Sequence, residues 1–178
     1  MYLFDRDISL THGEGGRFEG RLSENWSING TPNGGYIMAL LANAMRGQSL
    51  KKEPVILTAN YLFKCSTGPV SIATEHIAAG RRMERWQARL YQEGRMKILG
   101  MGTFCEQREA DAERRYEKLP PGIVSRDQCV YLPRIGEYTL YDQLEVRLDP
   151  ASAGWMEQRF SDRSEMKGWI RFADSRPY

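Results

Sequence analysis

The chain has 178 residues, of which 41% are hydrophobic and 27% are charged, and 25 basic against 23 acidic side chains leave a net charge of +2. This length has room for one domain, or for one domain and part of a second. The near-balance of charge gives no electrostatic case for binding nucleic acid, whereas a small basic pocket for a phosphorylated small molecule is compatible with it.

The cysteines and the N-terminus bear on the cellular compartment. Cys65, Cys105 and Cys129 form an odd set with no CxxC pair and no nearby histidine, so we expect reduced thiols and neither a disulfide framework nor a metal site. The first seven residues become charged at once, which predicts no signal peptide. The longest apolar stretch, Tyr36 to Ala42, is too short to cross a bilayer, so we expect no membrane insertion and a cytoplasmic protein.

A buried helix is predicted after the first strand region. A Gly-rich segment from Thr11 to Gly16 precedes an expected strand region over 17–28, and the residues from Asn29 to Gly35 are a strong turn signal. From Tyr36 to Met45 the residues are good helix formers and are apolar on nearly every side of the helical wheel, which is typical of a buried helix. Asn33 or Thr31 can cap its start, and the helix would be roughly 20 Å long.

Four strands with a period of two follow the helix. They are expected at about 55–63, 70–79, 83–92 and 96–106, joined by short turns that favour an antiparallel meander of hairpins. One long apolar helix followed by strands that can wrap it predicts an α+β fold of the hotdog type, in which a sheet encloses a single buried helix.

The composition then divides the chain into three parts. Residues 1–107 are expected to form an N-terminal hotdog domain, and 108–137 a charged linker that begins in a dense mixed-charge run. Strand alternation resumes at Tyr138, and Lys167 to Ala173 reads as one more strand, but no second buried helix follows. We therefore expect 138–178 to be an incomplete second hotdog, the opening strands only. Uncovered edges of such strands predict self-association into a homo-oligomer.

Five segments carry a family likeness, in the order Trp26–Tyr36, Thr58–Leu62, Gly80–Arg82, Gln92–Gly94 and Gly168–Asp174. Together they resemble the thioesterase-like relatives of acyl-CoA thioesterase II, a double-hotdog family. The resemblance implies hydrolysis of fatty acyl-CoA thioesters to free acid and coenzyme A, with no cofactor besides the coenzyme A of the substrate. The family's catalytic Asp, Thr or Ser, and Gln belong to the second repeat. The alternative is therefore a non-catalytic acyl-CoA-binding module, or a structural half that needs a partner chain.

Four residues are candidates for the chemistry of thioester hydrolysis. Gly34 and Gly35 can offer backbone N–H groups to an oxyanion at a helix N-terminus, or they merely make a tight turn. Asn33 can hold a water or simply cap the helix. Gln92 continues an apolar strand face and matches the first-repeat counterpart of the family's Gln; it can meet a substrate or water, or make a structural hydrogen bond to the neighbouring turn.

Six further residues are candidates for binding the substrate: Tyr36, Thr58, Asn60, Tyr61, Arg81 and Arg82. The two arginines suit the phosphates of coenzyme A, although a plain basic hairpin is the simpler explanation. Thr58 and Asn60 lie on the opposite strand face from Tyr61, so they can instead meet the second repeat, another subunit or solvent. The predicted helix has no Asp, Glu, His or Cys, which disfavours dehydratase or hydratase chemistry in this repeat.

Overall fold

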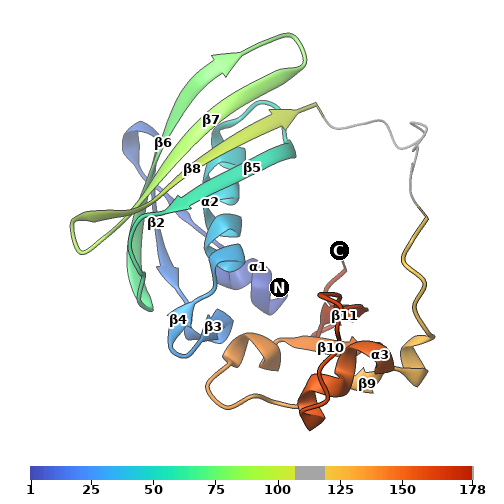
Figure 1. The fold of residues 1–178 in the computed structure, drawn as a ribbon. Helices are drawn as coiled ribbons and strands as arrows, with labels where there is room; N and C mark the ends of the chain where they lie inside the picture. Colours follow the sequence, from blue (N-terminus) through green and yellow to red (C-terminus); the bar gives the residue numbers. More distant parts are fainter. Residues whose placement is uncertain (107–118, 178) are drawn as a thin grey trace.

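The computed structural model describes residues 1–106 and 119–177. Within them, six strands form one antiparallel sheet in the order β1-β2-β6-β7-β8-β5. The 15-residue helix α2 (Gly34–Gln48) packs against this sheet, which curves around it (Figure 1). The strands are β1 (Thr11–His12), β2 (Arg17–Leu22), β5 (Glu53–Tyr61), β6 (Gly68–Ala79), β7 (Met83–Gln92) and β8 (Arg95–Cys105). This is the α+β hotdog fold that the sequence predicts.

The order of the strands corrects the predicted meander. Hairpins join β6 to β7 and β7 to β8, as expected, but β5 pairs with β8 and β6 pairs with β2. The turn at 66–69 is therefore a crossover between strands that are not neighbours. The sequence shows only that a turn is present, because the choice of partner depends on which strands can close around the helix.

The core lies between α2 and the inner face of the sheet. Leu40, Leu41 and Ala44 of the helix are at most 1% exposed. Close approach of helix and sheet is possible because β8 presents glycine there. A Cβ on Gly102 would lie 2.7 Å from a ring carbon of Phe104 and 3.0 Å from the terminal methyl of Met45, so a larger residue would overpack this contact.

A short N-terminal helix, α1 (Leu3–Asp7), closes one end of this core and was not foreseen from the sequence. Phe4 packs edge-on against Trp26 with ring centroids 5.1 Å apart. Asp7 accepts hydrogen bonds from the indole of Trp26 (3.0 Å) and the amide of Asn25 (2.8 Å). Burial would raise the pKa of Asp7, but these donors and Arg6 together hold it below its ordinary value.

A second, three-stranded sheet has the order β11-β10-β9, with β9 (Val130–Tyr131), β10 (Leu144–Leu148) and β11 (Gly168–Phe172). The two later strands fall where the sequence predicts them. β9 lies inside the expected linker, 108–137, of which residues 108–118 are outside the described residues. Short elements complete this region: the 3-10 turns η3 (Arg126–Gln128), η4 (Thr139–Asp142) and η5 (Gly154–Glu157), and the helix α3 (Pro150–Ala153).

Hydrogen bonds from segments beside the second sheet tie it to the first unit, near the N-terminal end of α2 (Figure 1). Two further pieces of the first unit lie there, the turn η2 (Glu24–Trp26) and the hairpin of β3 (Ser27–Ile28) and β4 (Thr31–Pro32). The Thr139 hydroxyl donates to the Glu24 carbonyl at 2.5 Å and accepts from the Ser27 N–H at 3.1 Å. Asp174, just after β11, accepts from the Leu3 N–H at 3.0 Å. The chain ends of the described structure thus meet at α1.

None of the helices in the described residues combines the length and the apolar character needed to cross a lipid bilayer.

Candidate functional site

A pocket of about 390 Å³ opens beside the N-terminus of α2. Its walls come from the turn before the helix, the first turn of the helix, the end of β5 with the segment after it, and β8. The lining residues are Thr31, Pro32, Gly34, Ile37, Tyr61, Leu62, Phe63, Lys64, Cys65 and Ile98. The lining is largely apolar and is closed at one end by the positive end of a helix dipole, which suits an apolar chain that carries a polar carbonyl.

Asn33 begins the helix as a side-chain cap. Its Oδ1 accepts from the Gly35 N–H at 2.8 Å and, more weakly, from the Tyr36 N–H at 3.4 Å. This is the capping geometry that was one of the two predicted roles of Asn33. The cap occupies the Gly35 donor, so of the two predicted oxyanion donors only the Gly34 N–H is without a partner among the described residues.

Tyr61 and Gly34 are in direct contact across the mouth of the pocket. The Tyr61 hydroxyl donates to the Gly34 carbonyl at 2.6 Å. A Cβ on Gly34 would lie 3.1 Å from that hydroxyl oxygen, so glycine is what allows the ring to close over the turn. Burial raises the pKa of Tyr61, with a smaller contribution from Cys65. Tyr61 therefore stays a neutral hydrogen-bond donor at physiological pH.

The segment after β5 supplies a wall of the pocket that the sequence did not single out. Phe63 lies beneath the guanidinium of Arg95, 3.3 Å from ring centroid to Cζ. Cys65 is buried, and burial raises the pKa of its thiol against the opposing effect of Lys97. A thiol in this state is a poor nucleophile. Lys64 also lines the pocket, so the positive charge in its lining comes from this lysine and not from the predicted pair Arg81 and Arg82.

Gln92 has its amide occupied by the backbone of the crossover between β5 and β6. Its Oε1 accepts from the Ser66 N–H at 3.0 Å, and its Nε2 donates to the Ser66 carbonyl at 2.8 Å. The side chain is 6% exposed. This geometry favours the structural alternative for Gln92, because both ends of the amide hold the crossover in place.

Tyr36 is likewise committed to the fold. Its ring is 3% exposed, and its hydroxyl donates to the Asp7 carbonyl at 2.8 Å and accepts from the Ser23 N–H at 3.1 Å. Burial raises its pKa. Tyr36 therefore anchors α2 to the N-terminal segment and does not line the pocket.

Four other predicted substrate contacts lie away from the pocket. Thr58 and Asn60 are exposed on the outer face of β5, opposite the inward-facing Leu57 and Ala59. Arg81 and Arg82 are exposed in the β6–β7 hairpin, where the Lys51 ammonium contacts the Arg81 carbonyl at 3.1 Å. That hairpin lies at the C-terminal end of α2, about 22 Å along the helix from Gly34.

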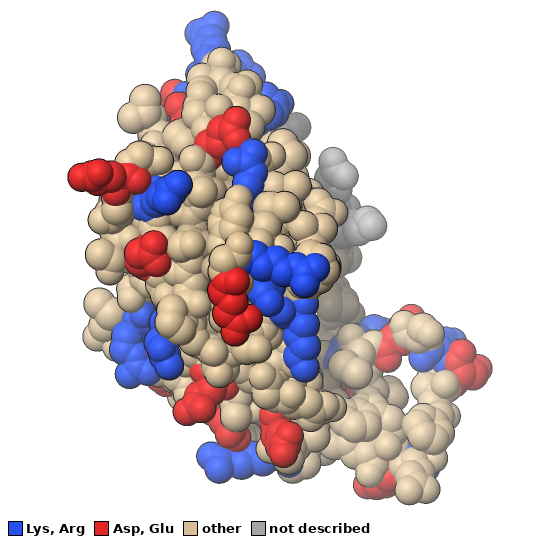
Figure 2. Space-filling view, turned by 90° about the vertical axis from the view of Figure 1, so that its left-hand side faces the viewer, with Lys and Arg blue, Asp and Glu red and all other residues tan. Residues whose placement is uncertain are grey.

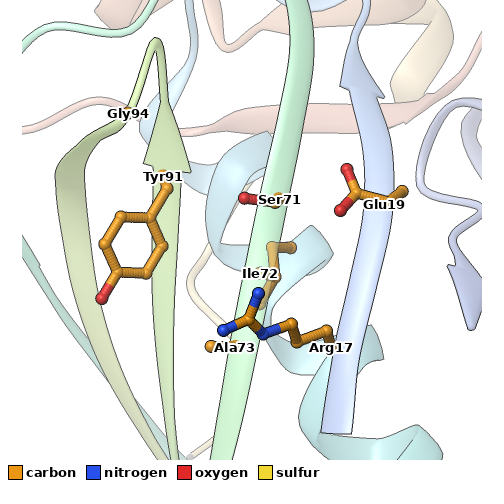
Figure 3. A pocket seen from close by; sticks show the side chains of 7 residues that line it. All are labelled: Arg17, Glu19, Ser71, Ile72, Ala73, Tyr91 and Gly94. Atoms are coloured by element: carbon orange, nitrogen blue, oxygen red, sulfur yellow. The ribbon is translucent and has the colours of Figure 1, made fainter. Parts of the chain in front are cut away.

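The outer face of the first sheet has a separate hollow of about 290 Å³. It contains none of the predicted site residues. Figure 3 shows the Glu19 carboxylate turned toward Ser71 and the Arg17 guanidinium beside Ala73. The side of the molecule at the left of Figure 1 carries basic and acidic side chains interspersed, as Figure 2 shows, with neither sign prevailing. Such a surface is typical of a solvated sheet face.

Comparisons with known proteins point to one family. Residues 22–105 match the family model of the acyl-CoA thioesterase N-terminal domain. Uncharacterized proteins of Mycobacterium tuberculosis and Mycobacterium bovis are 34% identical over 95 residues, covering 50% of this chain and 33% of their own length. This chain therefore matches only about a third of those relatives.

Solved structures show the same fold over nearly the whole chain. A protein of Thermobifida fusca YX described as a candidate thioesterase II has a TM-score of 0.89 and 24% identity, over 98% of this chain and 65% of that one. A hot dog fold protein of unknown function from Alicyclobacillus acidocaldarius has a TM-score of 0.81 and 19% identity, over 98% and 64%. The tesB protein of Mycobacterium avium subspecies paratuberculosis has a TM-score of 0.74 and 17% identity, over 98% and 62%.

Proposed function

We propose that this chain, whose residues 22–105 match the family model of the acyl-CoA thioesterase N-terminal domain, takes part in hydrolysing fatty acyl-CoA to free acid and coenzyme A. The observation that carries the proposal is the apolar pocket that ends at the N-terminus of α2. An acyl chain would lie along the apolar wall, with its thioester carbonyl at the Gly34 N–H.

In the proposed reaction, water adds to the thioester carbon, the C–S bond breaks, and the thiolate of coenzyme A takes up a proton. The Gly34 N–H and the helix dipole would stabilise the negative charge that develops on the carbonyl oxygen. Tyr61, neutral and bonded to the Gly34 carbonyl, would hold the turn that presents this donor. Its role is to position the donor.

A group that deprotonates the water must come from elsewhere. The residues that line the pocket in the described structure include no carboxylate and no histidine. This supports the alternative that the chain is a half that needs a partner chain, here a second copy. The end strand β5 presents half-exposed apolar side chains for such a contact, among them Ile56 at 57% and Val55 at 50%.

We also propose that this reaction takes place in the cytoplasm. The three cysteines, Cys65, Cys105 and Cys129, are unpaired thiols, as expected for a reducing compartment.

The test is coenzyme A release from a panel of acyl-CoAs of increasing chain length, with acyl-CoA binding measured on the same samples. Gly34→Val should abolish turnover and weaken binding, because its side chain would meet Tyr61 in the pocket mouth. Gly122→Val is the matched control, since a Cβ at Gly122 meets nothing within 4 Å. Saturable binding without turnover would instead identify a non-catalytic binding module. Equal activity in the two variants would exclude this pocket as the site.

Association with a second copy of the chain is tested by a separate measurement. Light scattering should give a particle larger than one chain, and Ile56→Lys on the β5 edge should reduce it to one chain. A wild-type protein that is a monodisperse monomer would overturn the second-copy model while leaving the pocket assignment untouched.

A further inference from the structure

The outward face of the second sheet holds a cluster of arginines that the thioesterase proposal does not use. Glu145 and Arg147 alternate with Val146 and Leu148 along β10, so the charged pair lies on the face opposite the apolar one. Arg171 stands directly across from Glu145 on β11, and η3 brings in Arg126. A hollow of about 400 Å³ lies over this face.

One carboxylate organises three of these arginines. Glu145 Oε1 accepts from Arg126 Nη2 at 2.5 Å and from Arg147 Nε at 2.6 Å, and Oε2 accepts from Arg171 Nε at 2.6 Å. These contacts hold the pKa of Glu145 down to about 2, with the Arg147 bond the largest cause. The carboxylate thus stays ionised and fixes the three guanidinium groups in place.

Within residues 1–106 and 119–177, most of the donors of these arginines remain available for a ligand. Each guanidinium carries several N–H donors in a rigid fork, and the contacts to Glu145 use one from Arg126, one from Arg147 and two from Arg171. The side chains are partly exposed, from 27% for Arg147 to 51% for Arg171. They are therefore ordered by Glu145 and still open to solvent.

The charge of the hollow is positive. Arg134 also lines it and pairs with Asp142 at 3.1 Å, so four arginines face two acids. Asp127 lies 3.8 Å from Arg126, and counting it still leaves a net positive charge. Tyr131 lies beside Arg147, with its ring centroid 5.9 Å from Cζ. Several guanidinium forks around a small hollow match the oxygens of phosphate groups.

We propose that this hollow binds the phosphate groups of a small molecule, with Arg147 and Arg134 as ligands and Glu145 as the residue that positions the cluster. The site goes beyond the proposed thioesterase reaction, because it lies on the second sheet and shares no residue with the pocket at α2. A nucleotide and an inorganic polyphosphate present the same chemistry to it.

The experiment is isothermal titration calorimetry of the whole chain with inorganic pyrophosphate at low ionic strength. We expect saturable binding that weakens as salt is added, and that falls about tenfold or more in Arg147→Gln. Arg134→Gln, at a side chain that is 83% exposed, should also weaken binding without disturbing the fold. Arg89→Gln is the matched control, since Arg89 also pairs with one carboxylate, Glu75, but on the first sheet.

Each result of the pyrophosphate titration either supports the phosphate site or overturns it. Absence of saturable pyrophosphate binding by the folded wild-type chain would overturn the site, as would equal affinity in wild type, Arg147→Gln and Arg134→Gln. Displacement of bound pyrophosphate by ADP or by coenzyme A would support the site and identify a nucleotide as its ligand. Displacement by neither would support an inorganic polyphosphate site. Because the readout is binding of pyrophosphate, it does not depend on whether acyl-CoA is hydrolysed.

Discussion

The two sheets of this chain differ in what covers their apolar faces. The first sheet closes around α2, and its core cluster includes fully buried residues from the helix and from β2, β6, β7 and β8. Among the described residues, the second sheet packs with the four-residue α3 and the short turns η4 and η5, and its buried cluster is Leu132, Leu148 and Ala153. The unit that contains the long helix thus has the larger buried core.

The two units also differ in the donors that bind a central carboxylate, Glu84 in the first unit and Glu145 in the second. Glu84 in the first unit is buried and is bonded by neutral donors, the Ser49 hydroxyl at 2.5 Å and the Leu50 N–H at 3.0 Å. Glu145 in the second unit is bonded by three arginines at a partly open surface. The first arrangement stabilises the loop after α2, while the second keeps charge available at the surface.

The largest effect should come from removing a buried leucine in each unit. Leu40→Ala in α2, where the side chain is fully buried, should lower the free energy of unfolding by about 2–5 kcal/mol. Leu148→Ala in β10 should cost about 2 kcal/mol, near the lower end, because its smaller cluster can collapse around the cavity. Urea unfolding of the whole chain measures both.

The control for the leucine pair is Leu50→Ala, since Leu50 is 88% exposed and its loss should change the free energy of unfolding by less than about 0.5 kcal/mol. Equal losses for Leu40 and Leu148 would show that the second sheet is as well packed as the first.

A smaller, pH-dependent effect is expected at Glu84. Hydrogen bonding from Ser49, opposed by burial, lowers its pKa in the folded chain. Its stabilisation is therefore present above the ordinary Glu pKa of about 4.3 and is lost as pH falls through the lower, folded value. Glu84→Gln should cost about 1.5–3 kcal/mol at pH 7, and the difference from wild type should shrink in acid.

Denaturant midpoints measured from pH 7 downward test this expectation for Glu84. Glu75→Gln, at an exposed ion pair with Arg89, should change stability by less than about 1 kcal/mol. If the stability difference between Glu84→Gln and wild type grew in acid, the ionised Glu84 carboxylate would not be stabilising the fold.

Local patterns in the sequence predicted the elements that are long and periodic. The helix from Gly34 and the strands after it follow from apolar spacing, and the cap at Asn33 follows from turn chemistry. The five-residue α1 and the two-residue β9 were missed, because such short segments show no measurable period. Strand order was missed as well, since pairing partners are chosen through space.

Contacts made through space also explain why the sequence predicted the candidate site only in part. Asn33, Gly34 and Tyr61 come together because a turn and the end of its neighbouring strand meet at one end of the helix. The contacts of Gln92 depend on the crossover at 66–69, which only the strand order reveals. Sequence alone found the donor turn but could not tell which polar groups the fold already uses.

The smallest effect is expected from removing the side-chain caps of α2 and α3. Asn33→Ala removes the side-chain acceptor of α2 and should cost about 1 kcal/mol in unfolding free energy, with Asn33→Ser restoring most of it. Asp149 caps α3 in the same way, through the Ala151 N–H at 3.0 Å. Asp149→Ala should leave global unfolding nearly unchanged and speed amide hydrogen exchange only near Ala151, because a four-residue helix contributes little beyond its own turn. Equal global losses from the two caps would mean that both units unfold as one, despite their unequal cores.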